Sequence, residues 1–402
     1  MLALIALALA AVTMLVRPFG LPYWTAPAVG AVIVASVSGT EVARSAVSPL
    51  VEPLLFLVFA VPLAVSLDDL GLFEAITSEI TAGRHLDFQL WGLAALVVVV
   101  FNLDAAVVLL TPLYIRLARR RGLSPEALAF PPVLLACLAS GLLPVSNLTN
   151  LIAADQLGLG VTDFVRHMAA PTVVAVGVGF LAYRRVFPPA VPGPAEHDGP
   201  ADPGDRTGAS SHRPSQREER RALRRGLPIV VAVLVGFTLG DVVGVPAWVV
   251  AATATVWASC WSRTVRWRSV PLGAITVAGG LAVLVAAALP SLALDTVLGR
   301  TGITGRIGAL VFGVVGSNAT NNLPAVLAAV PSLGDTGQVW PLLVGTDMGP
   351  VLVLTGSLST LLWRDTARQL GVDVTARRYS SVGIRVGGPA LLAATAVVLL
   401  VG

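Results

Sequence analysis

Charged residues are scarce in this chain of 402 residues, and lysine is absent from it. Charged residues make up 12% of the sequence and apolar residues 55%, whereas an ordinary soluble domain is about 25% charged. The 27 basic residues are all arginines, and they fall between apolar runs of roughly 17 to 20 residues, long enough to cross a bilayer. The net charge of +4 therefore reflects membrane topology, with no nucleic-acid partner expected. The composition predicts an all-α polytopic membrane protein.

Residues that commonly carry enzyme chemistry are also rare. The two cysteines, Cys137 and Cys260, lie in separate apolar runs, so they make neither a disulfide framework nor a zinc site. No glycine-rich phosphate loop is present, which excludes ATP hydrolysis by this chain. The four histidines are scattered, and no metal pair, aspartate-rich diphosphate motif or Ser–His pair falls within one apolar bundle. An intramembrane enzyme is thus disfavoured, and neither a cofactor nor a metal is expected.

Two short stretches, about 220 residues apart, repeat each other. Asn102 and Pro112 delimit the first stretch, and Asn321 and Pro331 delimit the second. Each is followed by another polar interruption of an apolar run, at 146–151 and at 356–361. Polar groups at membrane depth are costly and usually mark a substrate or ion path. Paired, interrupted segments in two halves of a chain indicate the binding site of a transporter.

The apolar runs predict two repeats of one plan, with about 10 transmembrane helices, two re-entrant hairpins, and helices broken at the midplane. The first repeat covers 1–187 and the second 227–402, and the polar segment 188–226 between them is predicted to be a disordered cytoplasmic linker. Short apolar arms predict hairpins at 89–116 and 303–331. The other expected segments are helices at 2–16, 24–40, 50–67, 168–187, 227–243, 246–262, 270–289 and 384–401, a polar stretch at 68–87, and broken helices at 126–165 and 339–363.

The arginines also predict the orientation of each segment. If the linker is cytoplasmic, every arginine falls on the cytoplasmic side except Arg44, Arg166, Arg300 and Arg306. This asymmetry follows the rule that basic residues flank membrane helices on the inside. The two repeats are then inverted, with both termini outside. One hairpin enters from each side, so the tips at Asn102 and Asn321 should approach each other in the core.

The side chains in the four breaks suit a particular kind of solute. Helix ends beside such breaks expose backbone groups that protein, water or a ligand must satisfy, and helix N-termini favour anions or oxygen-rich ligands. Asn, Ser and Thr both donate and accept hydrogen bonds. Such residues also hold helices together, but their pairwise repetition favours a site. The candidate substrate-binding residues are Asn102, Ser146, Asn147, Thr149, Asn150, Ser317, Asn318, Asn321, Asn322, Thr355, Ser357 and Thr360.

These stretches resemble a known family. The segments 101–112, 144–155, 320–324 and 345–363 are similar to the hairpin tips, unwound helix and most distinctive stretch of the arsenical-pump membrane proteins. That family is the arsenite efflux branch of the ion transporter superfamily. The chain departs from it at Leu103-Asp104, where the family pattern has Asp-Gly. The resemblance implies export of arsenite, and also of antimonite, across the plasma membrane.

Several partners follow from the resemblance. They are a metalloid or small anion as substrate, protons or sodium as coupling ion, the lipid bilayer, a separate ATPase subunit, and a second copy of the chain as a homodimer. A sodium-coupled carrier of di- or tricarboxylates from the same superfamily is the alternative function. Arsenous acid is a neutral trihydroxide near pH 7, which amide and hydroxyl side chains suit. The cysteines are interpreted as small buried hydrophobes, not as thiol ligands of trivalent arsenic.

Carboxylates within or near the breaks are candidates for proton coupling. They are Asp104, Asp347 and Asp155. A carboxylate surrounded by hydrocarbon favours its protonated form, which suits reversible proton carriage. The structural alternatives are helix capping by Asp347, a tip hydrogen bond for Asp104, and a solvated helix rim for Asp155.

The orientation can be tested in the linker. We expect Ser210→Cys to resist a membrane-impermeant thiol reagent in intact cells, because the arginine asymmetry places 188–226 inside. The same cysteine should react after the membrane is permeabilised. Labelling in intact cells would contradict the predicted orientation and place the linker outside.

Overall fold

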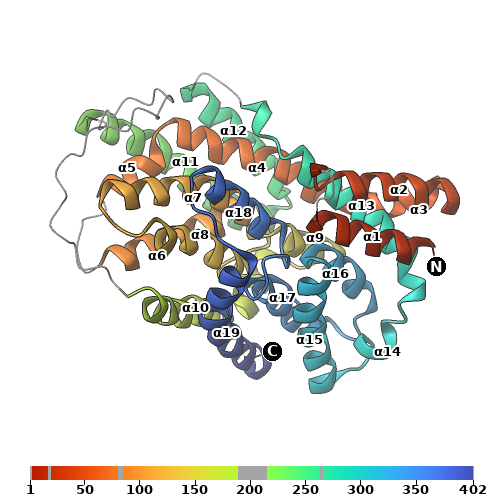
Figure 1. The fold of residues 1–402 in the computed structure, drawn as a ribbon. Helices are drawn as coiled ribbons and strands as arrows, with labels where there is room; N and C mark the ends of the chain where they lie inside the picture. The colour runs from red at the N-terminus through yellow and green to blue at the C-terminus, as the bar shows by residue number, and fades with distance from the viewer. Residues whose placement is uncertain (1, 17–19, 80–84, 189–214, 263–265, 402) are drawn as a thin grey trace.

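Helices make up the regular structure of this protein in the computed structural model. The structure describes residues 2–16, 20–79, 85–188, 215–262 and 266–401, and no strand occurs among them. Most of the predicted linker, 189–214, lies outside the described residues. Figure 1 shows the helices as a single elongated assembly, with the N-terminal helices at one end.

The surface is that of a membrane protein. Five described helical stretches are long and apolar enough to cross a bilayer: 40–69, 161–186, 216–240, 272–291 and 376–400. Large apolar side chains are exposed along several helices, among them Val32, Val242 and Leu392, which are 66%, 75% and 71% exposed. Exposed apolar surface on this scale marks contact with lipid or with another protein. The predicted class, an all-α polytopic membrane protein, is confirmed.

The first half contains both kinds of predicted interruption. The hairpin arms α6 and α7 meet at Asn102, and α8 and α9 flank the break at 139–147. Both hairpin arms are longer than predicted: α6 begins at Leu86, and α7 continues past the apolar segment to Arg120. The helices are α1 (Leu2–Val16), α2 (Thr25–Ser38), α3 (Thr40–Val47), α4 (Val51–Asp69), α5 (Leu72–Glu79), α6 (Leu86–Phe101), α7 (Leu103–Arg120), α8 (Pro125–Leu138), α9 (Leu148–Leu157) and α10 (Val161–Val186).

The second half has the same two interruptions in the same order. The arms α15 and α16 meet at Asn321, and α17 and α18 flank the break at 349–357. The helices are α11 (Gln216–Val243), α12 (Ala247–Ser262), α13 (Leu272–Ala288), α14 (Asp295–Leu298), α15 (Gly302–Thr320), α16 (Asn322–Ala329), α17 (Val339–Met348), α18 (Leu358–Gln369) and α19 (Ala376–Val401).

Several predicted boundaries are wrong. The helices predicted to begin at 168 and 384 begin at Val161 and Ala376, and two other boundaries differ because of a local cap. The helix expected to run to residue 165 ends at Leu157, since Gly158 takes a left-handed conformation with φ of 64°. The helix expected from 227 begins at Gln216, so 216–226 is not disordered. Ser215 and Glu218 form a reciprocal capping box there: the Glu218 carboxylate accepts from the Ser215 backbone N–H at 2.7 Å.

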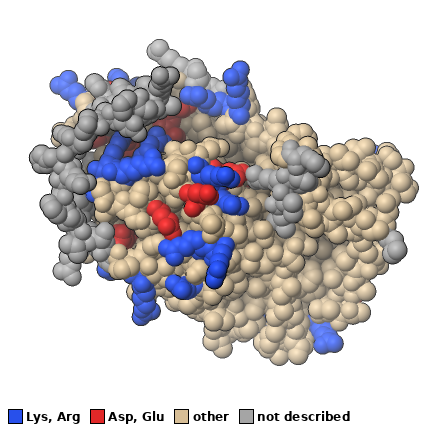
Figure 2. All heavy atoms as spheres, in the orientation of Figure 1, with Lys and Arg blue, Asp and Glu red and all other residues tan. Residues whose placement is uncertain are grey.

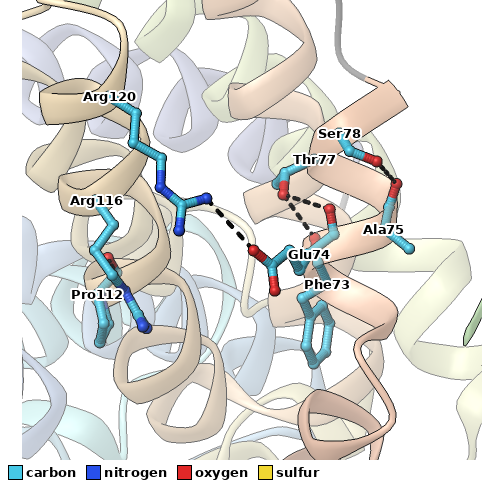
Figure 3. Close-up of polar contacts among 8 residues, drawn as sticks. All are labelled: Phe73, Glu74, Ala75, Thr77, Ser78, Pro112, Arg116 and Arg120. Carbon is cyan, nitrogen blue, oxygen red and sulfur yellow. Dashed lines mark hydrogen bonds and ion pairs between the residues drawn. The ribbon is translucent and has the colours of Figure 1, made fainter. Parts of the chain in front are cut away.

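The polar stretch at 68–87 contains a helix that the sequence interpretation missed. Helix α5 lies beside α7, and Glu74 of α5 accepts from Arg120 of α7 at 3.4 Å (Figure 3). Thr77 turns its hydroxyl back to the carbonyl oxygens of Phe73 and Glu74. Both charged partners are exposed, so the ion pair contributes about 1 kcal/mol at most.

The helices form two groups. Helices α1, α2 and α3 pack with α13 of the second half and share one apolar cluster, and these four helices form one end of the molecule in Figure 1. Figure 2 shows that the visible face over this group is almost uncharged, whereas charged side chains gather over α5, α7 and α18. The remaining helices form the second group, which includes the helices that flank the breaks. Within it, α10 lies along α19.

Two glycines allow α15 and α17 to cross closely. A Cβ on Gly313 would lie 2.6 Å from the carbonyl oxygen of Leu342, and a Cβ on Gly345 would lie 2.5 Å from that of Leu310. Small residues let membrane helices approach at their backbones. The crossing holds the second hairpin against the helix that leads into the second break.

We expect Gly345→Ala to lower the thermal unfolding midpoint of the purified protein. The added methyl group cannot fit without separating the helices, and such overpacking costs about 1–3 kcal/mol. Gly177→Ala in α10 is the matched control, because a Cβ there would meet nothing within 4 Å. Equal midpoints for the two variants would contradict a close crossing.

Candidate functional site

The two hairpin tips share an unusual backbone conformation. Asn102 has φ of 89° and ψ of 150°, and Asn321 has φ of 101° and ψ of 152°. This region of backbone space is essentially restricted to glycine and costs another residue about 1–3 kcal/mol. The side-chain oxygen of Asn102 accepts from the Asp104 N–H at 2.9 Å, and that of Asn321 accepts from the Leu323 N–H at 3.3 Å. Each tip asparagine therefore caps the helix that follows it.

The broken helices restart with the same kind of cap. The side-chain oxygen of Asn147 accepts from the Thr149 N–H at 3.2 Å, and the Ser357 hydroxyl accepts from the Ser359 N–H at 3.3 Å. Both capping residues have extended backbone and are buried. The helices α7, α9, α16 and α18 thus begin in the same way, one after each predicted break.

These four helix N-termini converge on one small cavity. Its volume is about 40 Å³, enough for at least one water-sized group. Its lining residues are Leu103, Asp104, Asn147, Leu148, Thr149, Ala274, Val277, Asn321, Asn322, Leu323, Ser357, Leu358 and Ser359.

The cavity combines neutral polar groups with one carboxylate. Residues at four helix N-termini line it, and such ends carry partial positive charge. Asp104 is its only acidic lining residue among those the structure describes, and no arginine lines it. Such a cavity can hold a small solute rich in oxygen atoms through donors and acceptors of either kind.

Hydrogen bonds join the two halves around this cavity. The Ser359 hydroxyl of α18 donates to the half-buried Asp104 carboxylate of α7. The Asn147 amide donates to the Asp347 carboxylate of α17 at 2.9 Å. Within the second half, the Asn322 N–H donates to the Gly356 carbonyl oxygen at 3.1 Å and joins the hairpin tip to the second break.

Asp347 lies behind the start of α9, outside the cavity lining. Its Oδ1 also accepts from the Thr149 hydroxyl at 3.4 Å, while its buried Oδ2 has no hydrogen-bond partner among the described residues. The buried Thr172 hydroxyl is likewise unpartnered within the described part of the chain. A Cβ on Gly141 would lie 3.1 Å from that hydroxyl and 3.5 Å from the free Asp347 oxygen, so both oxygens border the space beside Gly141.

The structure divides the predicted site residues. Asn147, Thr149, Asn321, Asn322, Ser357 and Asp104 line the cavity. Several others bond to backbone carbonyl oxygens away from it: Ser146 to Val99, Asn150 to Ser140, Ser317 to Val314, Asn318 to Val314 and Gly349, and Thr360 to Leu354 and Ser357. Asn102 caps its helix from a buried position, and Thr355 is half-buried outside the lining.

Asp155 is exposed and borders a different pocket. That pocket lies between α4, α9 and the turn joining α11 to α12, and Glu52 and Trp248 also line it. It measures about 480 Å³. Asp155 is thus separated from the cavity by the length of α9.

Seven lining residues were not among the predicted site residues: four leucines next to the caps (Leu103, Leu148, Leu323 and Leu358), together with Ser359, Ala274 and Val277. Ser359 stands two residues after the Ser357 cap, so the break itself signalled it. Ala274 and Val277 of α13 close another side of the cavity. They belong to an uninterrupted apolar helix, and only the packing of α13 against α16 brings them to the site.

Comparison with known proteins places these features in a family. Residues 1–355 match the model of the citrate transporter family. An arsenical pump membrane protein of Yersinia enterocolitica is 28% identical over 377 residues, covering 84% of this chain and 83% of that protein. An arsenical pump membrane protein of Escherichia coli is 27% identical over 373 residues, with the same coverage.

The family match spans both hairpins, the first broken helix and most of the second break. It agrees with the membrane-spanning helices and the interrupted segments around a buried cavity. The chain belongs to the citrate transporter family and is a multi-pass transporter of the plasma membrane, not an enzyme.

Proposed function

We propose that this transporter exports arsenite, with antimonite as a second substrate, in exchange for protons. The observation that carries the proposal is the small cavity where four capped helix N-termini converge. Its small volume of about 40 Å³ and its amide and hydroxyl lining suit a compact trihydroxide such as arsenous acid. The names of the two relatives support the same substrate.

A sodium-coupled carrier of di- or tricarboxylates is the alternative. The description of the family model favours it, and the helix N-termini would also attract carboxylates. The size of the cavity argues against it, because about 40 Å³ is far below the roughly 300–1,000 Å³ of pockets that hold larger organic ligands. The absence of arginine from the described lining residues argues in the same direction.

For the coupling ion, we propose that a proton is carried by Asp104 or Asp347. Asp104 borders the cavity and accepts from Ser359, so a bound solute can compete for the same carboxylate. Asp347 holds the Asn147 amide, which lines the cavity, and keeps a second oxygen without a partner among the described residues. Either carboxylate can therefore link its protonation to the shape of the site. The two inverted repeats, the ATPase subunit and the homodimer stay predictions.

The substrate can be tested by growth of a host that lacks its own arsenite pump. We expect the chain to raise the arsenite concentration that the host tolerates, because export lowers the internal concentration. Uptake of labelled citrate driven by sodium, with no change in arsenite tolerance, would support the alternative.

A change at Asn321 can separate the role of a cavity amide in transport from its role in the fold. We expect Asn321→Gly to lower arsenite transport at least about tenfold, because the ligand loses one hydrogen-bonding group, while thermal stability stays equal or rises, since glycine adopts φ of 101° without strain. Thr320→Val is the control: its hydroxyl bonds to Gly316 of its own helix and does not line the cavity. Full transport by Asn321→Gly would assign this amide a purely structural role.

Coupling can be tested by removing titration. We expect at least one of the single variants Asp104→Asn and Asp347→Asn to abolish arsenite accumulation in everted vesicles, where an acidic interior drives the exchange. The reason is that an amide cannot carry a proton. Asp373→Asn, at an exposed position between α18 and α19, should leave it unchanged. If both variants retain it, Asp155 becomes the next candidate, and accumulation driven by a sodium gradient would overturn proton exchange.

A further inference from the structure

Five arginines form one face at the start of α11. Arg217, Arg220, Arg221, Arg224 and Arg225 recur at the spacing that places residues on one side of a helix. The helix becomes apolar at Leu227, and the helical stretch 216–240 is long and apolar enough to cross a membrane. The arginine face therefore lies where the helix meets the membrane boundary.

The opposite face of α11 is held against α5. Ala222 is buried, and a Cβ on Gly226 would lie 2.8 Å from a methyl group of Leu72. This close contact fixes the rotation of α11 about its axis. The arginine face of α11 consequently points away from α5.

The arginine face lines a cavity with the end of α12. The five arginines and Trp261 line an open pocket of about 470 Å³, and no acidic residue is among the lining residues that the structure describes. The guanidinium of Arg225 lies 4.8 Å from the centre of the Trp261 ring, a cation–π contact that holds it in place. Five like charges on one helix face repel one another, and a bound anion would reduce that repulsion.

The chemistry of the cavity indicates its ligand. Guanidinium groups bind phosphate oxygens in pairs of hydrogen bonds. Tryptophan is enriched where membrane proteins meet lipid headgroups, and arginine clusters next to a membrane helix attract anionic lipids. We propose that this arginine pocket, formed by α11 and Trp261, binds the phosphate headgroup of an anionic phospholipid. The proposal is independent of the transported substrate.

Lipid titration of the purified full chain tests the proposal. Dioleoylphosphatidylglycerol added to the protein in neutral detergent should raise the thermal midpoint and saturate, because a ligand of the native state stabilises it. In Arg217→Gln/Arg220→Gln/Arg224→Gln the apparent affinity should fall about 100-fold, since each arginine near an anionic headgroup contributes about fivefold. The single variant Arg224→Lys keeps the charge but loses the paired hydrogen bonds. Its lipid-induced rise in thermal midpoint should therefore be smaller than that of the unmodified chain.

Matched controls separate the possible sources of the effect. Arg368→Gln/Arg377→Gln/Arg385→Gln removes the same charge from exposed positions on α18 and α19 and should respond like the unmodified chain. Dioleoylphosphatidylcholine should not raise the midpoint. Equal losses in the two triple variants, or an equal response to phosphatidylcholine, would overturn the proposal. Equal stabilisation by the same concentration of inorganic phosphate would reassign the pocket to a soluble anion.

Discussion

The architecture depends on satisfying the backbone where four helices begin inside an apolar bundle. A helix start leaves N–H groups unpaired, and hydrocarbon offers them no partner. One side-chain oxygen at each start, from Asn102, Asn147, Asn321 or Ser357, accepts from the N–H two residues later. Residues at all four starts line a common cavity. The same constraint that shapes the breaks therefore creates a polar cavity within the bundle.

The carboxylates connect this polar centre to both halves of the chain. Asp104 of the first half bonds to Ser359 of the second, and Asp347 of the second bonds to Asn147 of the first. The two contacts are reciprocal, and each involves a residue at or next to a helix start. A change in the protonation of either carboxylate would act directly on a contact between the halves. The proposed proton exchange would use these contacts to link protonation to the shape of the cavity.

Backbone strain at the tips is consistent with a functional role. Both tip asparagines occupy a region that glycine would adopt freely. A glycine would relieve the strain and cost little as a cap, yet it would remove an amide. Strain of this kind persists where the side chain does something that a relaxed residue cannot. The two tips share this property although they lie in different halves of the chain.

The local sequence determined the class, most of the helices and the four breaks, because an amide within an apolar run is a signal that neighbouring residues do not obscure. It also contained the capping box at Ser215 and Glu218, which the surrounding polar composition hid. Only the tertiary structure decided which polar residues face the cavity. Asn147 and Asn150 lie three residues apart, yet one lines the cavity and the other bonds to Ser140. The direction of a side chain follows from the rotation of its helix, which contacts such as Gly313 with Leu342 set. Those contacts join segments that are distant in the chain, so no local pattern could predict them.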